Sequence, residues 1–157
     1  MIRVLFVCLG NICRSPMAEA VFQEYVDEAG LTDAFEVDSA GTGSWHVGEP
    51  AHRGTLTVLR RHGIPYDGRA RQVQPTDLAH YDYVIALAGE NARDLRRLDR
   101  SGVLDGKLYQ LMDFTPPGYP RDVPDPYYNG RFDEVYDLVD AGAAGLLDHI
   151  RAEHELA

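Results

Sequence analysis

The chain has 157 residues, of which 45% are hydrophobic and 25% charged, and its formal net charge is −10. This length suits one domain with a core of its own, predicted over residues 1–157, and the acidic balance argues against nucleic acid as a partner. No apolar stretch approaches the roughly 20 residues that span a bilayer, and the 2 cysteines fit a reducing compartment, so we expect a cytoplasmic protein without membrane contact.

Strand and helix patterns alternate along the chain. The apolar run Val4-Leu5-Phe6-Val7 predicts a strand buried on both faces. Pro16 suits the first position of the following helix, with Ser15 as its candidate N-cap and Gly30 as its end. The same patterns predict, in chain order, a strand over 35–39, a helix over about 51–62, a strand over 83–87, a helix over about 90–100, a weaker strand near 107–110 and a helix over about 132–150.

This alternation predicts the fold class. Strands that alternate with helices form a parallel sheet covered on both faces, so we expect a three-layer α/β/α domain of the flavodoxin-like, Rossmannoid kind with four parallel strands. Ligands of such sheets bind beyond the carboxyl ends of the strands. The loops that reach this edge are 8–15, 39–50, 88–91 and 111–130.

The loop after the first strand has the character of a phosphate cradle. It reads Cys8-Leu9-Gly10-Asn11-Ile12-Cys13-Arg14-Ser15 and leads into the first helix. A loop that closes on a helix N-terminus directs backbone N–H groups and the positive end of the dipole at a bound oxyanion. A thiol there ionises readily, which makes Cys8 a candidate nucleophile, and the guanidinium of Arg14 can hold two phosphate oxygens. The alternative is a buried structural cysteine beside a surface arginine.

A thiolate that attacks a phosphate ester needs a general acid to protonate the leaving oxygen. The best candidate is Asp125 in Asp125-Pro126-Tyr127-Tyr128, with Asp113 and Asp122 as alternatives in the same loop. Tyr127 and Tyr128 would wall a slot for an aromatic group. The competing interpretation is an Asp-Pro turn with core tyrosines.

Two further features have two interpretations each. Trp45, in a glycine-rich loop at the same edge, is either a platform for an aromatic ring or a hydrophobic plug under the loop. The arginines between His52 and Arg71 are either a solvated helix face or a local positive field for an anionic substrate.

These motifs together resemble the low-molecular-weight protein tyrosine phosphatases over nearly the whole chain. The matching segments are Cys8 to Ser15, Asp38-Ser39-Ala40-Gly41-Thr42 with Trp45 beyond it, Arg69-Ala70-Arg71-Gln72, and Asp125-Pro126-Tyr127-Tyr128. The resemblance implies an enzyme that works without a metal or cofactor through a phosphocysteine.

The same resemblance implies roles for single residues. Cys8 is the nucleophile, Arg14 the phosphate clamp and Asp125 the acid and then the base. Ser15 donates its hydroxyl to the thiolate, and Asn11 shapes the loop with support from Ser39. The remaining loop residues, with Trp45, Tyr127 and Tyr128, are the expected substrate contacts; they are Leu9, Gly10, Ile12 and Cys13.

The expected substrate is a protein or peptide that carries phosphotyrosine, with inorganic phosphate as product and inhibitor and a monomer as the working form. Phosphoarginine phosphatases of this fold tend to have Thr where this chain has Ile12, and arsenate reductases need additional cysteines. A hypothesis of another class is a phosphotyrosine-binding module with little turnover. Cys13 either packs under the loop or forms a reversible disulfide with Cys8 that protects the thiolate.

Two positions depart from the pattern of the family. Gly68 stands where similar phosphatases commonly have a His that supports the cradle, and Ala88 stands where they commonly have an Asp near the clamp arginine. Both are supports behind the reacting groups. We therefore predict an active enzyme whose cradle is less rigid than that of its relatives.

Overall fold

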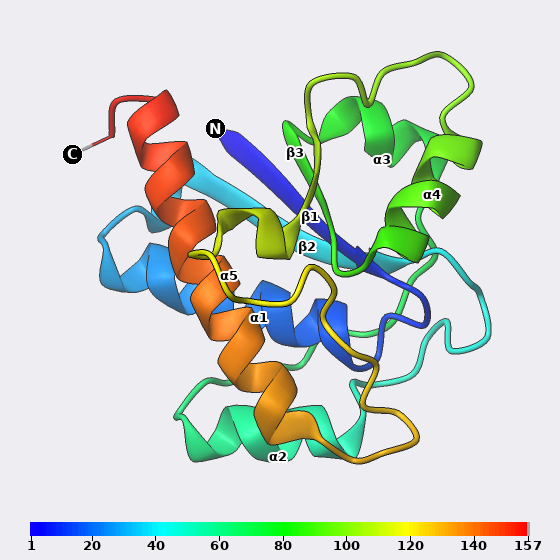
Figure 1. Cartoon of the computed structure of the whole chain (residues 1–157), viewed down its shortest axis with the longest axis vertical. Coiled ribbons are helices and arrows are strands. Elements are labelled where there is room, and N and C mark those ends of the chain that lie inside the picture. Colours follow the sequence, from blue (N-terminus) through cyan, green and yellow to red (C-terminus); the bar gives the residue numbers. More distant parts are fainter. Residues whose placement is uncertain (157) are drawn as a thin grey trace.

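Four parallel strands form the centre of the computed structural model, which describes residues 1–156 (Figure 1). Residue 157, the last of the predicted domain, lies outside the described residues. The strands are β1 Ile2–Cys8, β2 Phe35–Gly41, β3 Tyr83–Ala86 and β4 Leu108–Gln110, in the spatial order β2-β1-β3-β4. The predicted fold class is confirmed, since helices cover both faces of this sheet.

Successive residues of β1 face opposite layers, as the period of a strand requires. Val4 and Phe6 pack in a core with three helices, whereas Leu5 and Val7 pack in a second core on the other face. The helices on the first face are α1 Arg14–Glu28, α2 Arg53–Arg61 and α5 Phe132–Glu153, and those on the second are α3 Pro75–His80 and α4 Gly89–Leu98. Short 3₁₀ turns lie at Thr32–Ala34 and Leu111–Phe114. Among the described residues, no helix has both the length and the apolar character to cross a membrane.

The start of α1 corrects two predictions, the first of which is that Pro16 opens the helix, since Pro16 is its third residue. We expected Ser15 as the N-cap, but α1 begins at Arg14, Cys13 precedes it, and no side chain caps it. Ser15 therefore lies inside the first turn, where its hydroxyl contacts the sulfur of Cys8 at 3.0 Å. The N–H of Met17 donates to the Cys13 carbonyl at 3.4 Å and Pro16 has no N–H, so the backbone N–H groups of Arg14 and Ser15 are left for another acceptor.

Other helix ends follow the predicted chemistry, while one helix was not predicted. Gly30 and Gly63 follow α1 and α2 with φ of 73° and 71°, a conformation that glycine adopts without strain. The unpredicted helix is α3, which has 6 residues, opens on a proline and has a reciprocal capping box between Gln74 and Asp77. An element this short cannot show a helical apolar period.

The first loop is anchored against the end of β2. Cys8 pairs with Gly41 in the register of β1 and β2. The N–H of Thr42 donates to the carbonyl of Cys8 at 2.9 Å, and the N–H of Gly43 donates to that of Leu9 at 2.9 Å. A Cβ on Gly41 would lie 2.6 Å from the Leu9 carbonyl oxygen, so only glycine allows this approach. The end of β2 thus fixes where the loop lies.

Candidate active site

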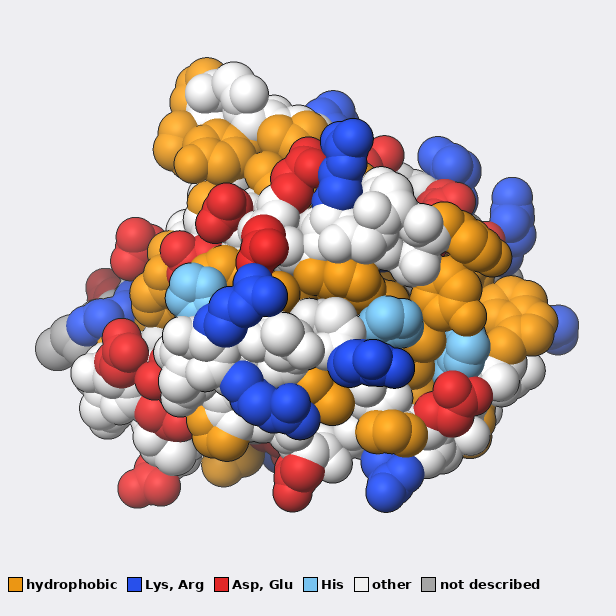
Figure 2. All heavy atoms as spheres, turned by 90° about the horizontal axis from the view of Figure 1, so that it is seen from below, with side chains coloured by type: hydrophobic (Ala, Val, Ile, Leu, Met, Phe, Trp, Pro, Cys, Tyr) orange, Lys and Arg blue, Asp and Glu red, His pale blue; other side chains and the backbone are white. Residues whose placement is uncertain are grey.

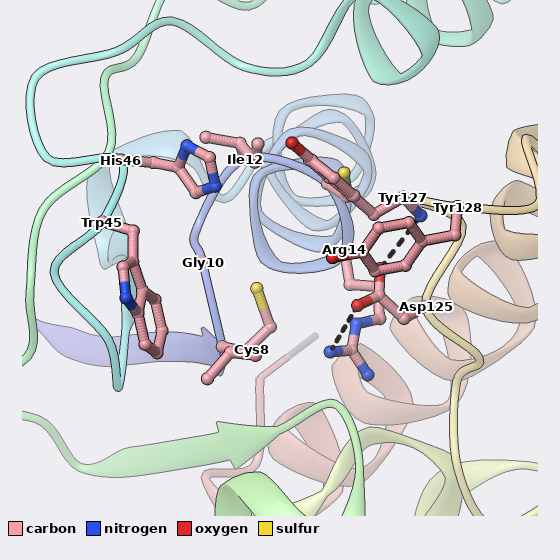
Figure 3. A pocket seen from close by; sticks show the side chains of 11 residues that line it. Cys8, Gly10, Ile12, Arg14, Trp45, His46, Asp125, Tyr127 and Tyr128 are labelled. Atoms are coloured by element: carbon pink, nitrogen blue, oxygen red, sulfur yellow. Dashed lines mark hydrogen bonds and ion pairs between the residues drawn. The ribbon is translucent and has the colours of Figure 1, made fainter.

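A hollow of about 340 Å³ opens at the carboxyl edge of the sheet, with Cys8 at its base (Figure 3). Arg14 and Asp125 lie together on one side of it, and Trp45 stands on the opposite side. Tyr127 and Tyr128 come from the loop before α5. The hollow is also lined by Leu9, Gly10, Ile12, Cys13 and His46. The fold therefore brings together the cysteine loop, the tryptophan loop and the Asp-Pro-Tyr-Tyr segment.

Asn11 organises the loop from beneath. Its φ is 57°, in the left-handed region that Asn tolerates better than most residues. The backbone N–H of Arg71 donates to its Oδ1 at 2.9 Å, and since a backbone N–H can only donate, this contact fixes which end of the amide is oxygen. The Nδ2 group then donates to Ser15 Oγ at 2.8 Å and to Ser39 Oγ at 3.0 Å. All three bonds of the buried amide are satisfied.

These bonds set the direction of a chain of hydrogen bonds that ends at the sulfur. Cys8 Sγ lies 3.0 Å from Ser15 Oγ and accepts the backbone N–H of Asn11 at 3.3 Å. A thiolate can only accept, so the Ser15 hydroxyl is the donor when Cys8 is ionised. Two donors thus stabilise the anionic form of the sulfur.

At its other end the same chain reaches Glu19, which the sequence did not single out. Ser39 Oγ donates to Glu19 Oε1 at 2.6 Å, and the phenol of Tyr66 donates to the same oxygen at 2.9 Å. Burial raises the pKa of Glu19 from an ordinary 4.5 to about 7, although both hydroxyls favour its charged form. The carboxyl of Glu19 therefore joins two hydroxyl groups behind the cradle.

Tyr66 also accounts for the space beside Gly68. A Cβ on residue 68 would overlap the phenol oxygen of Tyr66, so glycine is what allows the ring to reach Glu19. The phenol of Tyr66 thus occupies the space into which a side chain at residue 68 would extend. The reduced rigidity that we inferred from Gly68 stays a prediction.

Arg14 is nearly enclosed, with 3% of its surface exposed. Its Nη1 donates to the Val123 carbonyl at 3.1 Å, while Nη2 lies 3.8 Å from Asp125 Oδ2 and 4.0 Å from Glu90 Oε1. Glu90 lies in the first turn of α4, which Ala88 precedes. A carboxylate therefore faces the guanidinium even though residue 88 has none.

Of the three candidate acids, Asp125 is the one that lines the hollow in the described part of the chain. It accepts the backbone N–H of Tyr127 at 3.0 Å, which holds the turn in place. Asp122 instead accepts the N–H of Gly89 at 2.9 Å, and Asp113 accepts that of Gln110 at 2.9 Å. These two carboxylates are engaged in local structure.

The aromatic side chains at the mouth are exposed. Trp45 is 70% exposed and Tyr128 92%, so the interpretations as a buried plug and as core tyrosines are wrong. The ring of Tyr127 lies with its centroid 6.0 Å from that of His46 and 5.7 Å from that of His52. His46 in turn contacts the carboxylate of Glu49 at 3.1 Å. The mouth therefore offers aromatic surface on both sides of the sulfur.

The two cysteines differ in their surroundings. Both are free thiols. Cys13 packs in the main core, and burial, followed by the negative charges of Cys8 and Asp125, raises its pKa to about 12. Cys13 therefore stays protonated at neutral pH, and Cys8 alone has donors that favour a thiolate.

The arginine-rich segment does not form a continuous basic surface. Figure 2 looks at the molecule from below, where α2 lies in Figure 1, and shows blue side chains scattered among red and white ones. Arg71 pairs with Asp38 and Asp77 at 3.0 Å each, and Arg61 pairs with Asp133 at 2.9 Å. Acidic partners thus neutralise two of the five arginines of the segment, which favours a solvated face over a steering field.

Comparison with known proteins identifies the family. The family model described as low molecular weight phosphotyrosine protein phosphatase matches residues 3–156. The low molecular weight protein-tyrosine-phosphatase YfkJ of Bacillus subtilis is 48% identical over 158 residues, which cover 99% of this chain and 100% of YfkJ. Its crystal structure matches with a TM-score of 0.94 over 98% of this chain and 96% of that one. The chain belongs to the low molecular weight phosphotyrosine protein phosphatase family, as the resemblance implied.

A more distant structure is that of a Drosophila arginine phosphatase. It is 30% identical to this chain and matches with a TM-score of 0.87 over 94% of this chain and 97% of its own. The same fold thus occurs in a protein named an arginine phosphatase, at lower identity than the tyrosine phosphatase of Bacillus.

The sequence interpretation missed Glu19, Tyr66, Glu90 and His46. Only Glu19 had a local signal, because it lies four positions after Ser15 and therefore on the same side of α1. A polar pair at this spacing in a largely buried helix indicates a shared polar neighbour.

Proposed function

We propose that this protein hydrolyses phosphotyrosine in proteins or peptides, with Cys8 as nucleophile, Arg14 as phosphate clamp and Asp125 as general acid and base. One observation carries the proposal. The sulfur of Cys8 lies at the base of a hollow with aromatic walls, where two groups can donate hydrogen bonds to it. Arg14 and Asp125 line the same hollow and lie 3.8 Å from each other. Thiolate, cation and acid are the three groups that this displacement requires.

In the first step the Cys8 thiolate attacks phosphorus, and an S–P bond forms as the P–O bond to tyrosine breaks. Arg14 and the N–H groups of the loop hold the other phosphate oxygens, so the work is positioning and charge stabilisation. Asp125 gives its proton to the leaving oxygen, because a phenol with a free pKa of about 10 leaves poorly as an anion.

In the second step Asp125, now a carboxylate, takes a proton from water while the water oxygen bonds to phosphorus. The S–P bond breaks, and inorganic phosphate and the thiolate result. The hydroxyl of Ser15 stabilises the sulfur as its charge returns. Inorganic phosphate fits the same cradle, so we expect it to inhibit competitively.

The walls of the hollow support an aromatic ester. Tyr127, Tyr128 and Trp45 provide ring faces, and Ile12 adds an apolar side chain rather than a hydroxyl. A phosphotyrosine ring buries more surface against such walls than a phosphoarginine chain does. Phosphoarginine is the second candidate because a protein named an arginine phosphatase shares this fold.

Initial rates with phosphotyrosine and phosphoarginine, for wild type, Cys8→Ser and Asp125→Ala, test the proposal. We expect the wild type to prefer phosphotyrosine and Cys8→Ser to bind it without turnover. A wild type that binds phosphotyrosine and does not hydrolyse it would be a binding module, and a preference for phosphoarginine would reassign the substrate.

Three further features belong to the proposal. The chain works as one domain over residues 1–157 and as a monomer, which sedimentation can test. We also place it in the cytoplasm, since both cysteines are free and the reaction needs a reduced Cys8. Localisation of a tagged full-length chain tests the compartment.

A further inference from the structure

A second hollow, which we call the Trp45 hollow, lies beside the catalytic one. It encloses about 390 Å³, and Leu9 and Trp45 belong to the walls of both. Val73 and, from α4, Arg97 and Leu98 form other parts of its lining. The two hollows are thus neighbours with a shared partition of two side chains.

Trp45, the larger side chain of this partition, projects into solvent. Trp45 is largely exposed, and Figure 3 shows it across the catalytic hollow from Asp125 and Tyr128. Its ring lies against the backbone of Gly43, where any Cβ would overlap the indole. Glycine at 43 therefore makes room for the indole, which belongs to the walls of both hollows.

The chemistry of the Trp45 hollow favours an apolar occupant. Val73 is buried, and Leu98 packs against the second core. The charged groups of the hollow are paired, since Arg97 donates to Asp94 at 2.9 Å. The amide of Gln72 donates to the Thr42 carbonyl at 3.2 Å, whereas the buried hydroxyl of Thr42 has no hydrogen-bond partner. An uncompensated charge that would select a charged side chain is therefore not found among these lining residues, and apolar burial is the available driving force.

Exposed apolar side chains continue from one hollow to the other. Leu9, Trp45, Tyr127 and Tyr128 are all large and exposed, and all line the catalytic hollow. Exposed apolar surface that gathers in this way marks a site of interaction with another molecule. A phosphotyrosine in a chain brings neighbours with it, spaced by about 3.3 to 3.6 Å per extended residue, so flanking residues must pass over this partition or the opposite rim.

From this continuity we infer that the Trp45 hollow binds an apolar side chain of the substrate protein, within a few residues of the phosphotyrosine. The inference rests on the proposed function, and it narrows the class of substrates to phosphotyrosine sites that have an apolar residue nearby. It makes the protein selective among phosphotyrosine sites by a contact that free phosphotyrosine cannot make.

A peptide series on the full-length protein tests this subsite. One leucine replaces serine at each flanking position in turn, and kcat/KM is compared with that of the all-serine peptide. We expect at least one position at which leucine raises kcat/KM on the order of tenfold, as apolar pockets do for a few methylene groups. Equal values at every position would overturn the inference.

Two variants of α4 locate the effect. Arg97→Trp places a bulky ring at the mouth of the Trp45 hollow, while Arg96→Trp, one position earlier, adds the same ring beside a different hollow near Asp99 and Leu104. The ratio of kcat/KM for the leucine peptide to that for the all-serine peptide should fall to about 1 in Arg97→Trp and stay at its wild-type value in Arg96→Trp. If it persists in Arg97→Trp, the apolar side chain binds elsewhere and the inference fails.

Turnover of free phosphotyrosine by the wild type separates the two proposals. If free phosphotyrosine is hydrolysed but the peptides show no preference, the proposed function holds and the subsite is wrong. If free phosphotyrosine and all peptides are inert, the proposed function itself is wrong.

Discussion

The base of the catalytic hollow and its mouth are built in opposite ways. At the base, Asn11, Ser15 and Ser39 are buried and joined by hydrogen bonds of 2.8 to 3.0 Å. At the mouth, Trp45 and Tyr128 are exposed and held by packing alone at their edges. The base is a fixed polar network, and the mouth is an adaptable apolar surface.

This difference assigns the chemical step to the base of the hollow and the choice among substrates to its mouth. A buried network in a low dielectric holds its donors in one geometry, which suits a reaction that depends on positioned charge. Exposed aromatic rings offer apolar contact surface to the residues that flank a phosphotyrosine. Changes at the base should therefore affect kcat, and changes at the mouth should affect KM and the choice among substrates.

The largest effect at the base is expected for Asp125→Ala. With a phosphotyrosyl peptide kcat should fall by about 10²- to 10⁴-fold, because the leaving phenol then departs unprotonated. With para-nitrophenyl phosphate, whose leaving group is far more acidic, the first step should change much less. Rapid-mixing measurement of the initial burst compares the two substrates, and equal losses with both would show that Asp125 is not the acid.

Glu19→Gln should change how stability depends on pH. Glu19 has a folded-state pKa of about 7 against an ordinary 4.5, so its proton is held more tightly in the folded protein. That favourable contribution is complete below about 4.5 and is lost as pH rises through about 7. Relative to Glu19→Gln, the wild type should lose on the order of 3 kcal/mol of unfolding free energy across this range.

Denaturant melts at both ends of that range measure the difference. Glu28→Gln, at the exposed end of the same helix, controls for the loss of one charge. A gap between wild type and Glu19→Gln that stays the same at both pH values would contradict the account.

Asn11→Gly should weaken the base without backbone strain, since glycine tolerates a φ of 57°. The hydroxyls of Ser15 and Ser39 lose a buried donor, and kcat/KM for phosphotyrosine should fall about 10- to 100-fold. Asn11→Ala should add strain and lower the melting temperature further. Unchanged kcat/KM in a folded Asn11→Gly would mean that the amide does not position the loop.

The smallest effect is expected at the mouth, for Trp45→Ala. KM for a phosphotyrosyl peptide should rise about 3- to 10-fold with kcat nearly constant, because the ring contributes binding surface and not chemistry. Val47→Ala, an exposed apolar residue of the same loop outside both hollows, is the matched control. A fall in kcat instead of a rise in KM would place Trp45 in the chemistry.

The contrast between base and mouth also explains what the sequence could predict. The parallel sheet, the Cys8 loop and Asp125 each have a local pattern: a buried apolar strand, a strand-to-helix loop and an Asp-Pro turn. Ser15 was expected in the cradle, but its role as N-cap was wrong because a contact to the sulfur replaced the cap.

Tyr66 could not be placed in the same way. Its contact with Glu19 joins residues 47 positions apart, and it depends on the absence of a Cβ at Gly68. Read by itself, Gly68 indicates a missing support. Only the packed structure indicates which side chain uses the space.

The most direct test of the account is to trap the covalent intermediate on Cys8. Asp125→Asn should still be phosphorylated by para-nitrophenyl phosphate, which needs no acid, but it lacks the base for hydrolysis, so phosphocysteine should accumulate. Acid quench and mass spectrometry of the peptide that contains Cys8 should then show one added phosphoryl group. Turnover of this substrate with an unmodified Cys8 in every sample, or with the phosphoryl group on another residue, would contradict the assignment of Cys8 as the nucleophile.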